Sequence, residues 1–149
     1  MDKRIEDYLS YLESVRGLSE RTLRVYREDL ERYEAFLAGA DVDAAAAHDI
    51  RAFAGSLVME GKASSSVNRA LSTIRGYYRY RMRFGGLAVD PGREVENLSS
   101  SRPLPKFMFE DEMAQLIESI DGAGFAEARD RALFEVLYST GCRASEIAG

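Results

Sequence analysis

Apolar side chains recur along this chain at intervals of three and four residues, the spacing that gathers them on one face of an α-helix. Four such segments precede residue 85: 5–15, 19–39, 47–60, and a segment that follows serines 64–66 and continues to Phe84. The side chains expected to point inward are Ile5, Tyr8, Leu9, Leu12, Leu23, Tyr26, Leu30, Tyr33, Leu37, Ile50, Phe53, Ala54, Leu57, Val67, Ala70, Leu71, Ile74, Tyr77 and Tyr78. No alternating strand pattern is evident, so the sequence predicts an all-α fold.

Helix-ending signals divide the chain into parts. Ser19 is a predicted N-cap, and Gly39, Gly61 and Gly85 follow the last turns of helical patterns. Residues 85–106 then collect glycine, proline and serine, the composition of a linker. Beyond it, 110–120 and 127–138 are predicted helices, and Arg143 opens a third. The predicted domains are 1–84 and 107–149, with 85–106 between them.

Composition narrows the class of protein. No stretch approaches the roughly 18 to 20 apolar residues that a membrane span requires, and the N-terminus has no signal-peptide pattern, so a cytoplasmic protein without membrane contact is expected. A single cysteine, Cys142, and a single histidine, His48, predict neither a disulfide nor a metal centre, and no cofactor is expected.

The net charge of -5 conceals an asymmetry along the chain. Residues 1–106 carry 17 basic and 16 acidic side chains, whereas residues 107–149 carry 3 and 9. Within the first part, 61–89 holds six basic side chains and no acidic one. A local excess of this kind is typical of proteins that bind nucleic acid.

The basic residues of the fourth segment form a stripe. On a helical wheel, the apolar residues from Val67 to Tyr78 share one sector, so Tyr77 and Tyr78 are expected in the core rather than stacked on bases. The opposite sector holds Asn68, Arg69, Ser72, Arg75, Arg79 and Arg83. Such a helix fits the major groove of DNA, where arginine binds guanine or phosphate and asparagine reads adenine. A merely solvated basic face is the alternative, although such faces usually mix both signs.

Four segments resemble one family. LSERTLRVYREDLERYEAFL and SSSVNRALSTIRGYYRY are similar to the two signatures of the core-binding domain of Xer-type tyrosine recombinases, relatives of phage integrases. RPLPKFMFEDEMAQLI resembles their linker and first catalytic-domain helix, and RDRALFEVLYSTGCRASEI resembles the segment with their first catalytic arginine. The resemblance covers nearly the whole chain in the right order. It implies a four-helix SAM-like bundle, a linker and the first helices of a truncated catalytic domain.

In that family the bundle and the catalytic domain clamp duplex DNA, with the second and fourth helices facing it. By this resemblance the expected contacts are Ser19, Arg21, Thr22, Tyr26, Ser66, Asn68, Arg69, Ser72, Arg75 and Arg79, and the basic stripe adds Arg83. For Thr22 and Tyr26 a local role, in the helix cap and in the core, stays open. The family acts as tetramers, and a cell-division DNA translocase is a further expected partner of the intact protein.

The family's chemistry is phosphoryl transfer, in which a tyrosine forms a 3′-phosphotyrosyl link without metal or cofactor. The resemblance makes Arg143 the ligand of the scissile phosphate and Glu146 its support, and the start of a helix after Gly141 favours an anion there. Cys142 replaces a larger apolar residue and is expected to be a small buried one. Because no tyrosine matches the nucleophile, we expect a fragment that cannot cleave DNA. The resemblance also implies that the C-terminal exchange element that links protomers is missing, so we expect a monomer.

Other classes of protein share some of these features. A non-enzymatic helical DNA-binding regulator would carry the basic helix but has no reason for the Arg143 motif, and a protein-interaction bundle has no reason for an acid-free stripe. Salt-dependent DNA binding separates the last class from the others. The sequence leaves open the target site, and whether the parent protein resolves chromosome dimers or integrates a mobile element.

Overall fold

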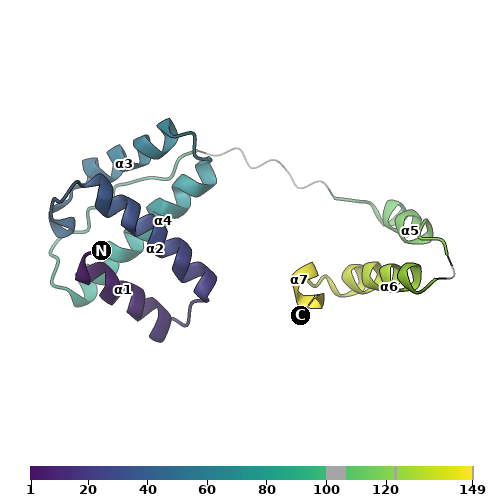
Figure 1. The fold of residues 1–149 in the computed structure, drawn as a ribbon. Coiled ribbons are helices and arrows are strands. Elements are labelled where there is room, and N and C mark those ends of the chain that lie inside the picture. The colour runs from purple at the N-terminus through teal and green to yellow at the C-terminus, as the bar shows by residue number, and fades with distance from the viewer. Residues whose placement is uncertain (100–106, 123, 149) are drawn as a thin grey trace. The chain divides into compact units, whose positions relative to one another are not determined.

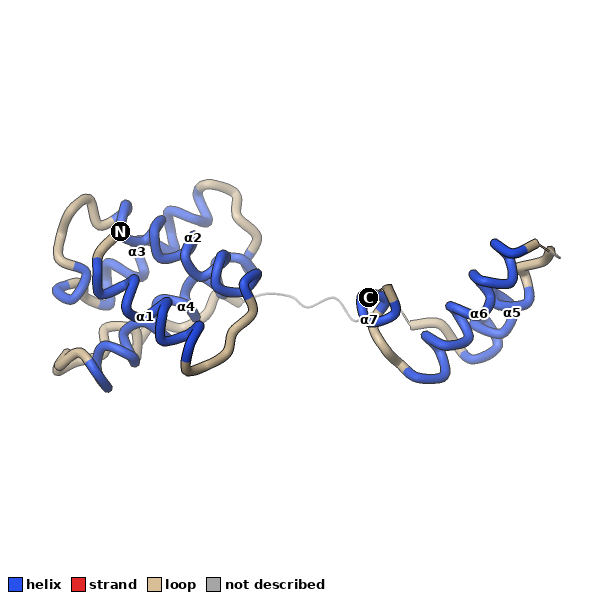
Figure 2. Tube along the Cα trace, turned by 60° about the horizontal axis from the view of Figure 1, so that its bottom comes forward, coloured by secondary structure: helices blue, strands red, loops and turns tan. Residues whose placement is uncertain are grey.

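The computed structural model describes residues 1–99, 107–122 and 124–148, and within these ranges the regular secondary structure is entirely helical (Figures 1 and 2). The chain divides into two compact units, Met1–Ser101 and Arg102–Gly149. No helix in the described ranges has both the length and the apolar character needed to cross a bilayer.

The first unit contains the four predicted helices. They are α1 (Lys3–Ser14), α2 (Glu20–Phe36), α3 (Ala47–Met59) and α4 (Ser64–Phe84), with a short 3-10 helix, η1 (Val42–Ala44), before α3. Ser19 caps α2 as predicted, because its hydroxyl accepts a hydrogen bond from the backbone N–H of Thr22. The fourth helix begins at Ser64, so the serines form its first turn instead of preceding it.

The predicted apolar faces form the core of this unit. α4 packs against each of the other three helices, and in Figure 1 α2 crosses it. All the inward residues predicted for α1, α3 and α4 are buried, which confirms the helical-wheel assignment. Of the inward residues predicted for the second helix, Leu30 and Tyr33 are buried, whereas Leu23, Tyr26 and Leu37 are half-buried at the edge of the core. The burial of these faces is the main source of stability for helices of this length.

Three tyrosines of the core, Tyr33, Tyr77 and Tyr78, have paired hydroxyls. The Tyr78 hydroxyl donates to the carbonyl of Val42 at 2.8 Å and lies 3.0 Å from the Tyr33 hydroxyl, and the Tyr77 hydroxyl donates to Asp43 at 3.2 Å. Tyr77 and Tyr78 are both fully buried, which confirms that they are core residues. Burial raises the pKa of all three tyrosines, that of Tyr33 to about 12, so these hydroxyls stay protonated and can donate.

Part of the segment predicted as a linker packs on the first unit. We call residues 92–98 the strap. Within it Val95 is only 4% exposed and belongs to the core, and Leu98 packs against the core. Gly92 is required by close approach, since a Cβ there would lie 2.8 Å from Cγ of Arg75. The strap therefore belongs to the same compact unit as α1 to α4.

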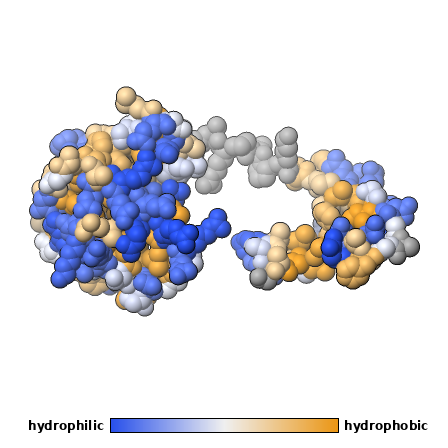
Figure 3. Space-filling view, in the orientation of Figure 1, coloured by the Kyte–Doolittle hydropathy of each residue, from blue (hydrophilic) through white to orange (hydrophobic). Residues whose placement is uncertain are grey.

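The second unit holds α5 (Glu110–Glu118), α6 (Phe125–Thr140) and α7 (Ala144–Ile147), and α5 packs against α6. None of its described residues is buried, and Phe107, Phe125 and Tyr138 are each more than half exposed. In Figure 3 this unit shows apolar surface along its helices. Cys142, expected to be buried, is only half-buried.

Candidate nucleic-acid interface

The basic flank of α4 faces solvent. Arg69, Ser72, Arg79 and Arg83 are exposed, while Ser66, Asn68 and Arg75 are partly exposed. The burial of the apolar sector on the other side of the helix fixes this orientation, because side chains about 180° apart on a helix cannot share an environment. The flank is therefore a surface, and the partners of each side chain decide what that surface can bind.

Arg69 is paired with a carboxylate of the neighbouring helix. Its Nε and Nη2 donate to the two oxygens of Asp29 on α2, both at 3.1 Å, and the Thr73 hydroxyl donates to the same carboxylate at 3.4 Å. Asp29 is only 5% exposed. This two-pronged pair joins α2 to α4 and neutralises one cation of the predicted stripe.

Two other members of the stripe hold the strap. The Asn68 side-chain amide donates to the carbonyl of Leu98 at 3.0 Å and accepts from its N–H at 2.8 Å. The Arg75 guanidinium donates to the carbonyl of Val95 at 2.9 Å and to the side-chain oxygen of Asn97 at 2.6 Å. A base contact by either side chain would need donors that these bonds leave free, or would have to replace the bonds.

Arg79 and Arg83 keep their charges available. Neither guanidinium has a carboxylate or hydrogen-bond partner among the residues that the structure describes. Arg83 lies over the ring of Phe84, with Cζ 5.2 Å from the ring centroid, a contact that leaves its charge intact. Within the described residues these two arginines are the members of the stripe whose guanidinium groups make neither an ion pair nor a hydrogen bond, whereas Arg75 keeps its charge but uses donors on neutral groups.

The DNA contacts expected from α2 lie at its N-cap and in its first two turns. The Thr22 hydroxyl is 3.0 Å from that of Ser19, so both side chains take part in the helix cap. Arg21 is exposed, and it makes no ion pair within the described part of the chain. Tyr26 is half-buried against the core. The local roles of Thr22 and Tyr26 are thus observed, and both side chains retain surface that a ligand could reach.

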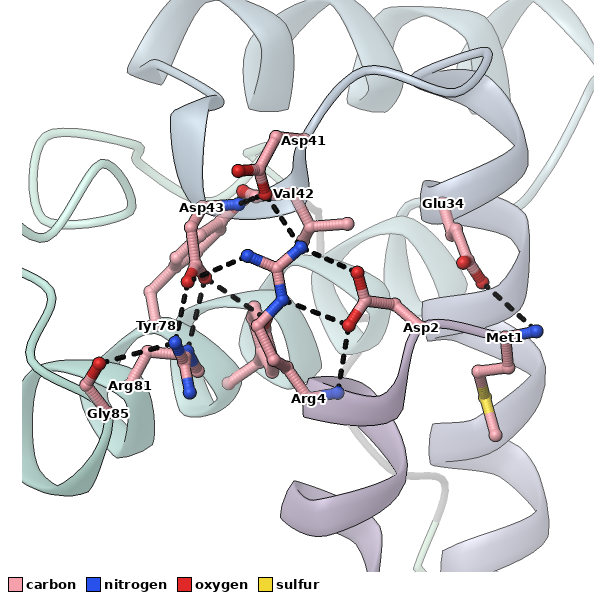
Figure 4. Close-up of polar contacts among 11 residues, drawn as sticks. Met1, Asp2, Arg4, Glu34, Asp41, Val42, Asp43, Tyr78, Arg81 and Gly85 are labelled. Atoms are coloured by element: carbon pink, nitrogen blue, oxygen red, sulfur yellow. Dashed lines mark hydrogen bonds and ion pairs between the residues drawn. The ribbon is translucent and has the colours of Figure 1, made fainter.

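Arg81 belongs to the acid-free run in the sequence but is compensated in space. It donates to Asp43 of η1 at 2.6 Å, within a cluster in which Arg4 also contacts Asp2, Asp41 and Asp43 at 2.6, 2.7 and 3.0 Å (Figure 4). The hydrogen bond from Arg4 lowers the pKa of Asp2 to about 2. Burial acts to raise the pKa of Asp43, but Arg81 and Arg4 outweigh it and the net shift is downward.

In the second unit Arg143 precedes α7. Gly141 adopts the left-handed conformation (φ 65°) that ends α6, which gives the tight turn expected from the sequence. Glu146 accepts from the Arg143 backbone N–H at 2.7 Å and from its Nη1 at 2.9 Å. These bonds lower the pKa of Glu146, the backbone one most. The Arg143 side chain is 82% exposed, so it can receive an anion while Glu146 holds one edge.

Sequence reasoning missed the partners and two further residues. Asp29 lies inside the Leu-Ser-x-x-Thr-x-x-x-Tyr-x-x-Asp-Leu pattern, which was a signal that its acid has a fixed role. No local signal marks Asp43 as the partner of Arg81, or the strap as the partner of Asn68. The two further residues are Tyr8 of α1 and Arg16 of the loop that follows it, which border the exposed flank of α4 beside Arg79.

Comparison with known proteins identifies the family. The phage integrase N-terminal SAM-like domain matches residues 5–85, more than half of the chain, and the chain belongs to that family. It is 40% identical over 152 residues to a tyrosine recombinase XerC of Treponema denticola, an alignment that covers 100% of this chain and 50% of that protein. A tyrosine recombinase XerD of Staphylococcus haemolyticus is 33% identical over 99% of this chain and 51% of its own.

A tyrosine recombinase XerC of Thermodesulfovibrio yellowstonii is 34% identical over 97% of this chain and 48% of its own. The chain thus spans about half the length of the curated relatives it matches. The resemblance to Xer-type tyrosine recombinases and the all-α fold with a SAM-like domain are confirmed.

Proposed function

We propose that this chain binds duplex DNA through the α2–α4 surface and forms the N-terminal part of a site-specific tyrosine recombinase. One observation carries the proposal: Arg79 and Arg83 stand on an exposed helix flank without a carboxylate partner in the described ranges. Uncompensated guanidinium groups along one helix are suited to phosphates on either side of a major groove. The match to tyrosine recombinases over nearly the whole chain supports the same function.

The proposed contacts differ in how freely they can be made. Ser19, Arg21, Thr22 and Tyr26 on α2, with Ser66, Ser72, Arg79 and Arg83 on α4, would meet DNA as they stand. Asn68, Arg69 and Arg75 would meet it through donors that their bonds to Leu98, Asp29 and Val95 leave free. Arg21, Arg79 and Arg83 therefore offer guanidinium groups that need no rearrangement to meet phosphates in this proposal.

The proposed reaction belongs to the intact protein. A tyrosine would lose its proton and attack the scissile phosphate, forming a 3′-phosphotyrosyl link as the bond to the 5′ oxygen breaks and that oxygen leaves as a protonated hydroxyl. The transition state places negative charge on the phosphate oxygens. Arg143 would donate to these oxygens, and Glu146 would hold its guanidinium in place, since it already binds Nη1 and the backbone N–H. Chromosome dimer resolution or integration of a mobile element is the proposed process.

The proposed organisation follows the domains read from the sequence. Residues 1–84 would clamp DNA, 107–149 would begin the catalytic domain, and the connection would lie between them, shortened by the strap. Other recombinase protomers and a cell-division DNA translocase are the proposed protein partners. The proposed site of action is the cytoplasm, where chromosomal DNA is found.

Salt dependence of DNA binding tests the proposal. About five neutralised phosphates give a slope of log affinity against log salt near -4 to -5, and Arg79→Ala lowers its magnitude by about one. Lys3→Ala, which removes an exposed charge from the start of α1, is the matched control and leaves the slope unchanged. An unchanged slope in Arg79→Ala contradicts phosphate contact by α4. A chain that binds no duplex at low salt contradicts the proposed function as a whole.

A further inference from the structure

A cavity of about 450 Å³ opens beside the proposed DNA surface. Its walls come from α1 and the loop after it, from Tyr26 of α2, and from the C-terminal half of α4. Ser72, Arg79 and Tyr26 line the cavity and also belong to the proposed DNA contacts, so the two surfaces are continuous. The volume lies within the range of small-molecule and cofactor sites.

The charge of the cavity is one-sided. Arg16, Arg79 and Arg83 line it, and no acidic side chain does. Arg16 is exposed and, like the other two, its guanidinium has no hydrogen bond or ion pair among the described residues. Three cations around one opening without a carboxylate repel one another, and an anion in their midst relieves this repulsion.

Tyr8 adds a buried donor at the same place. Its side chain is packed in the core, with 4% of the residue exposed, yet its hydroxyl has no hydrogen-bond partner in the described part of the chain. Every fully enclosed side-chain polar atom described there does have a partner, so this hydroxyl must reach the cavity that Tyr8 lines. The hydroxyl is therefore a free donor that opens into the cavity, where it can bind water or a ligand.

The backbone makes room for that hydroxyl. Gly76 of α4 lies opposite it, and a Cβ at this position would be 2.4 Å from the Tyr8 oxygen. Burial, the largest influence, raises the pKa of Tyr8 to about 12, so the hydroxyl keeps its proton and can donate. The remaining wall is aromatic: the rings of Tyr11, Tyr80 and Phe84 contact one another, with centroids 5.0 to 5.4 Å apart.

We infer that this cavity binds a backbone phosphate of the DNA strand that crosses the end of α4, with the adjoining deoxyribose against the aromatic wall. Arg16, Arg79 and Arg83 supply the charge, and the Tyr8 hydroxyl supplies a directed hydrogen bond to a phosphate oxygen. The inference rests on the proposed function and extends the DNA footprint to α1 and its following loop, which the sequence had not connected with DNA.

Two variants test the cavity separately from the α4 flank. Arg16→Ala removes a cation outside the proposed α2 and α4 contacts, and it lowers the magnitude of the salt slope by about one. Tyr8→Phe keeps the ring and removes only the hydroxyl, and it weakens duplex binding about 5- to 20-fold, because a hydrogen bond to a charged group is lost. Lys3→Ala, at the opposite end of α1, leaves both quantities unchanged.

The outcomes separate this inference from the proposed function. If both variants bind duplex DNA like the unmodified chain while Arg79→Ala weakens binding, the cavity inference is wrong and the DNA proposal stands. If no variant and no unmodified chain binds duplex, the proposed function itself is wrong. Thermal unfolding checks that each variant is folded, and Arg16→Ala, an exposed substitution, decides the case if Tyr8→Phe does not fold.

A second measurement identifies the source of the phosphate. Calorimetric titration with inorganic phosphate should show negligible binding at concentrations that saturate with duplex DNA, because a single phosphate brings no sugar for the aromatic wall. Tight binding of inorganic phosphate that Arg16→Ala abolishes, together with unchanged duplex binding in that variant, would assign the cavity to a small anion and overturn the inference.

Discussion

Asn68 and Leu98 exchange two hydrogen bonds across 30 residues of sequence, one in each direction between the side-chain amide and the backbone. The amide thus replaces the partner that a neighbouring strand would give Leu98. Arg75 donates to the carbonyl of Val95, three residues before Leu98, and to the side chain of Asn97, one residue before it. Two residues expected to read bases therefore fasten the chain that leaves the first domain.

Replacement of Asn68 by alanine should release the end of the strap. Because the backbone groups of Leu98 lose their partners, we expect the free energy of unfolding to fall by about 1 to 2 kcal/mol. Amide hydrogen exchange at Leu98 should be faster in the variant than in the unmodified chain. Exchange at Leu71, which lies in the core on α4, serves as the reference. Unchanged protection at Leu98 would show that the strap holds by Val95 alone.

The same variant measures the role of Asn68 in DNA binding. While Asn68 holds the strap, Asn68→Ala should weaken binding to every duplex by a similar factor. A base contact would instead give a loss of about 1 to 3 kcal/mol confined to one base pair of the site. A panel of duplexes with single substitutions distinguishes these patterns, and a loss at one position would uphold the prediction from sequence.

Substitution of Arg69 should lower the free energy of unfolding more than substitution of its partner Asp29. Arg69→Ala leaves the Asp29 carboxylate, which is 5% exposed, with the Thr73 hydroxyl as its one remaining side-chain donor in the described residues. We therefore expect the free energy of unfolding to fall by about 2 to 4 kcal/mol. Asp29→Asn keeps an acceptor oxygen and leaves Arg69, whose side chain is 47% exposed, to water. The free energy of unfolding of Asp29→Asn should therefore fall by about 1 kcal/mol. Urea unfolding measures both, and equal losses would contradict the buried character of Asp29.

Substitutions at Gly76 and at Tyr8 should have coupled effects on the stability of the protein. Gly76→Ala alone should destabilise, since the new Cβ would meet the Tyr8 oxygen at 2.4 Å, whereas the ring carbon behind it is 3.6 Å away, an ordinary contact. In a Tyr8→Phe background the clash is gone, so the same substitution should stabilise by about 1 kcal/mol through helix propensity. A double-mutant cycle by thermal unfolding measures the change of sign. Additive effects would show that Tyr8 can move aside.

Acid should weaken the Arg4 cluster. The pKa of Asp2 is lowered to about 2 from 3.8 by its bond to Arg4, and Asp41 and Asp43 are lowered as well. A carboxyl whose pKa is lower in the folded state than in the unfolded state stabilises the protein at pH values above its unfolded-state pKa. This stabilisation is lost as the pH falls through the folded-state pKa. The free energy of unfolding should therefore decline between about pH 4 and pH 2. Arg4→Gln should flatten this decline in denaturant titrations; an identical pH profile would contradict the prediction.

The sequence by itself determined the helices, the cap at Ser19 and most of the buried faces. Ile5, Phe53 and Ile74 lie in the core as their spacing predicted, and Ser19 caps α2. These features are local, because helical periodicity and capping depend on residues within a few positions of one another. The family follows from the same local motifs, since the residues that carry them are contiguous in the chain.

Only the tertiary structure decided which cations remain available. Arg69 and Arg81 meet Asp29 and Asp43 from 40 and 38 residues away, so an acid-free run in the sequence is not an acid-free surface in space. Arg79 stays uncompensated, and packing places Arg16 and Tyr8 beside it in one cavity. Electrostatic pairing depends on distance in three dimensions, and the packing of α1, α2 and η1 on α4 sets that distance.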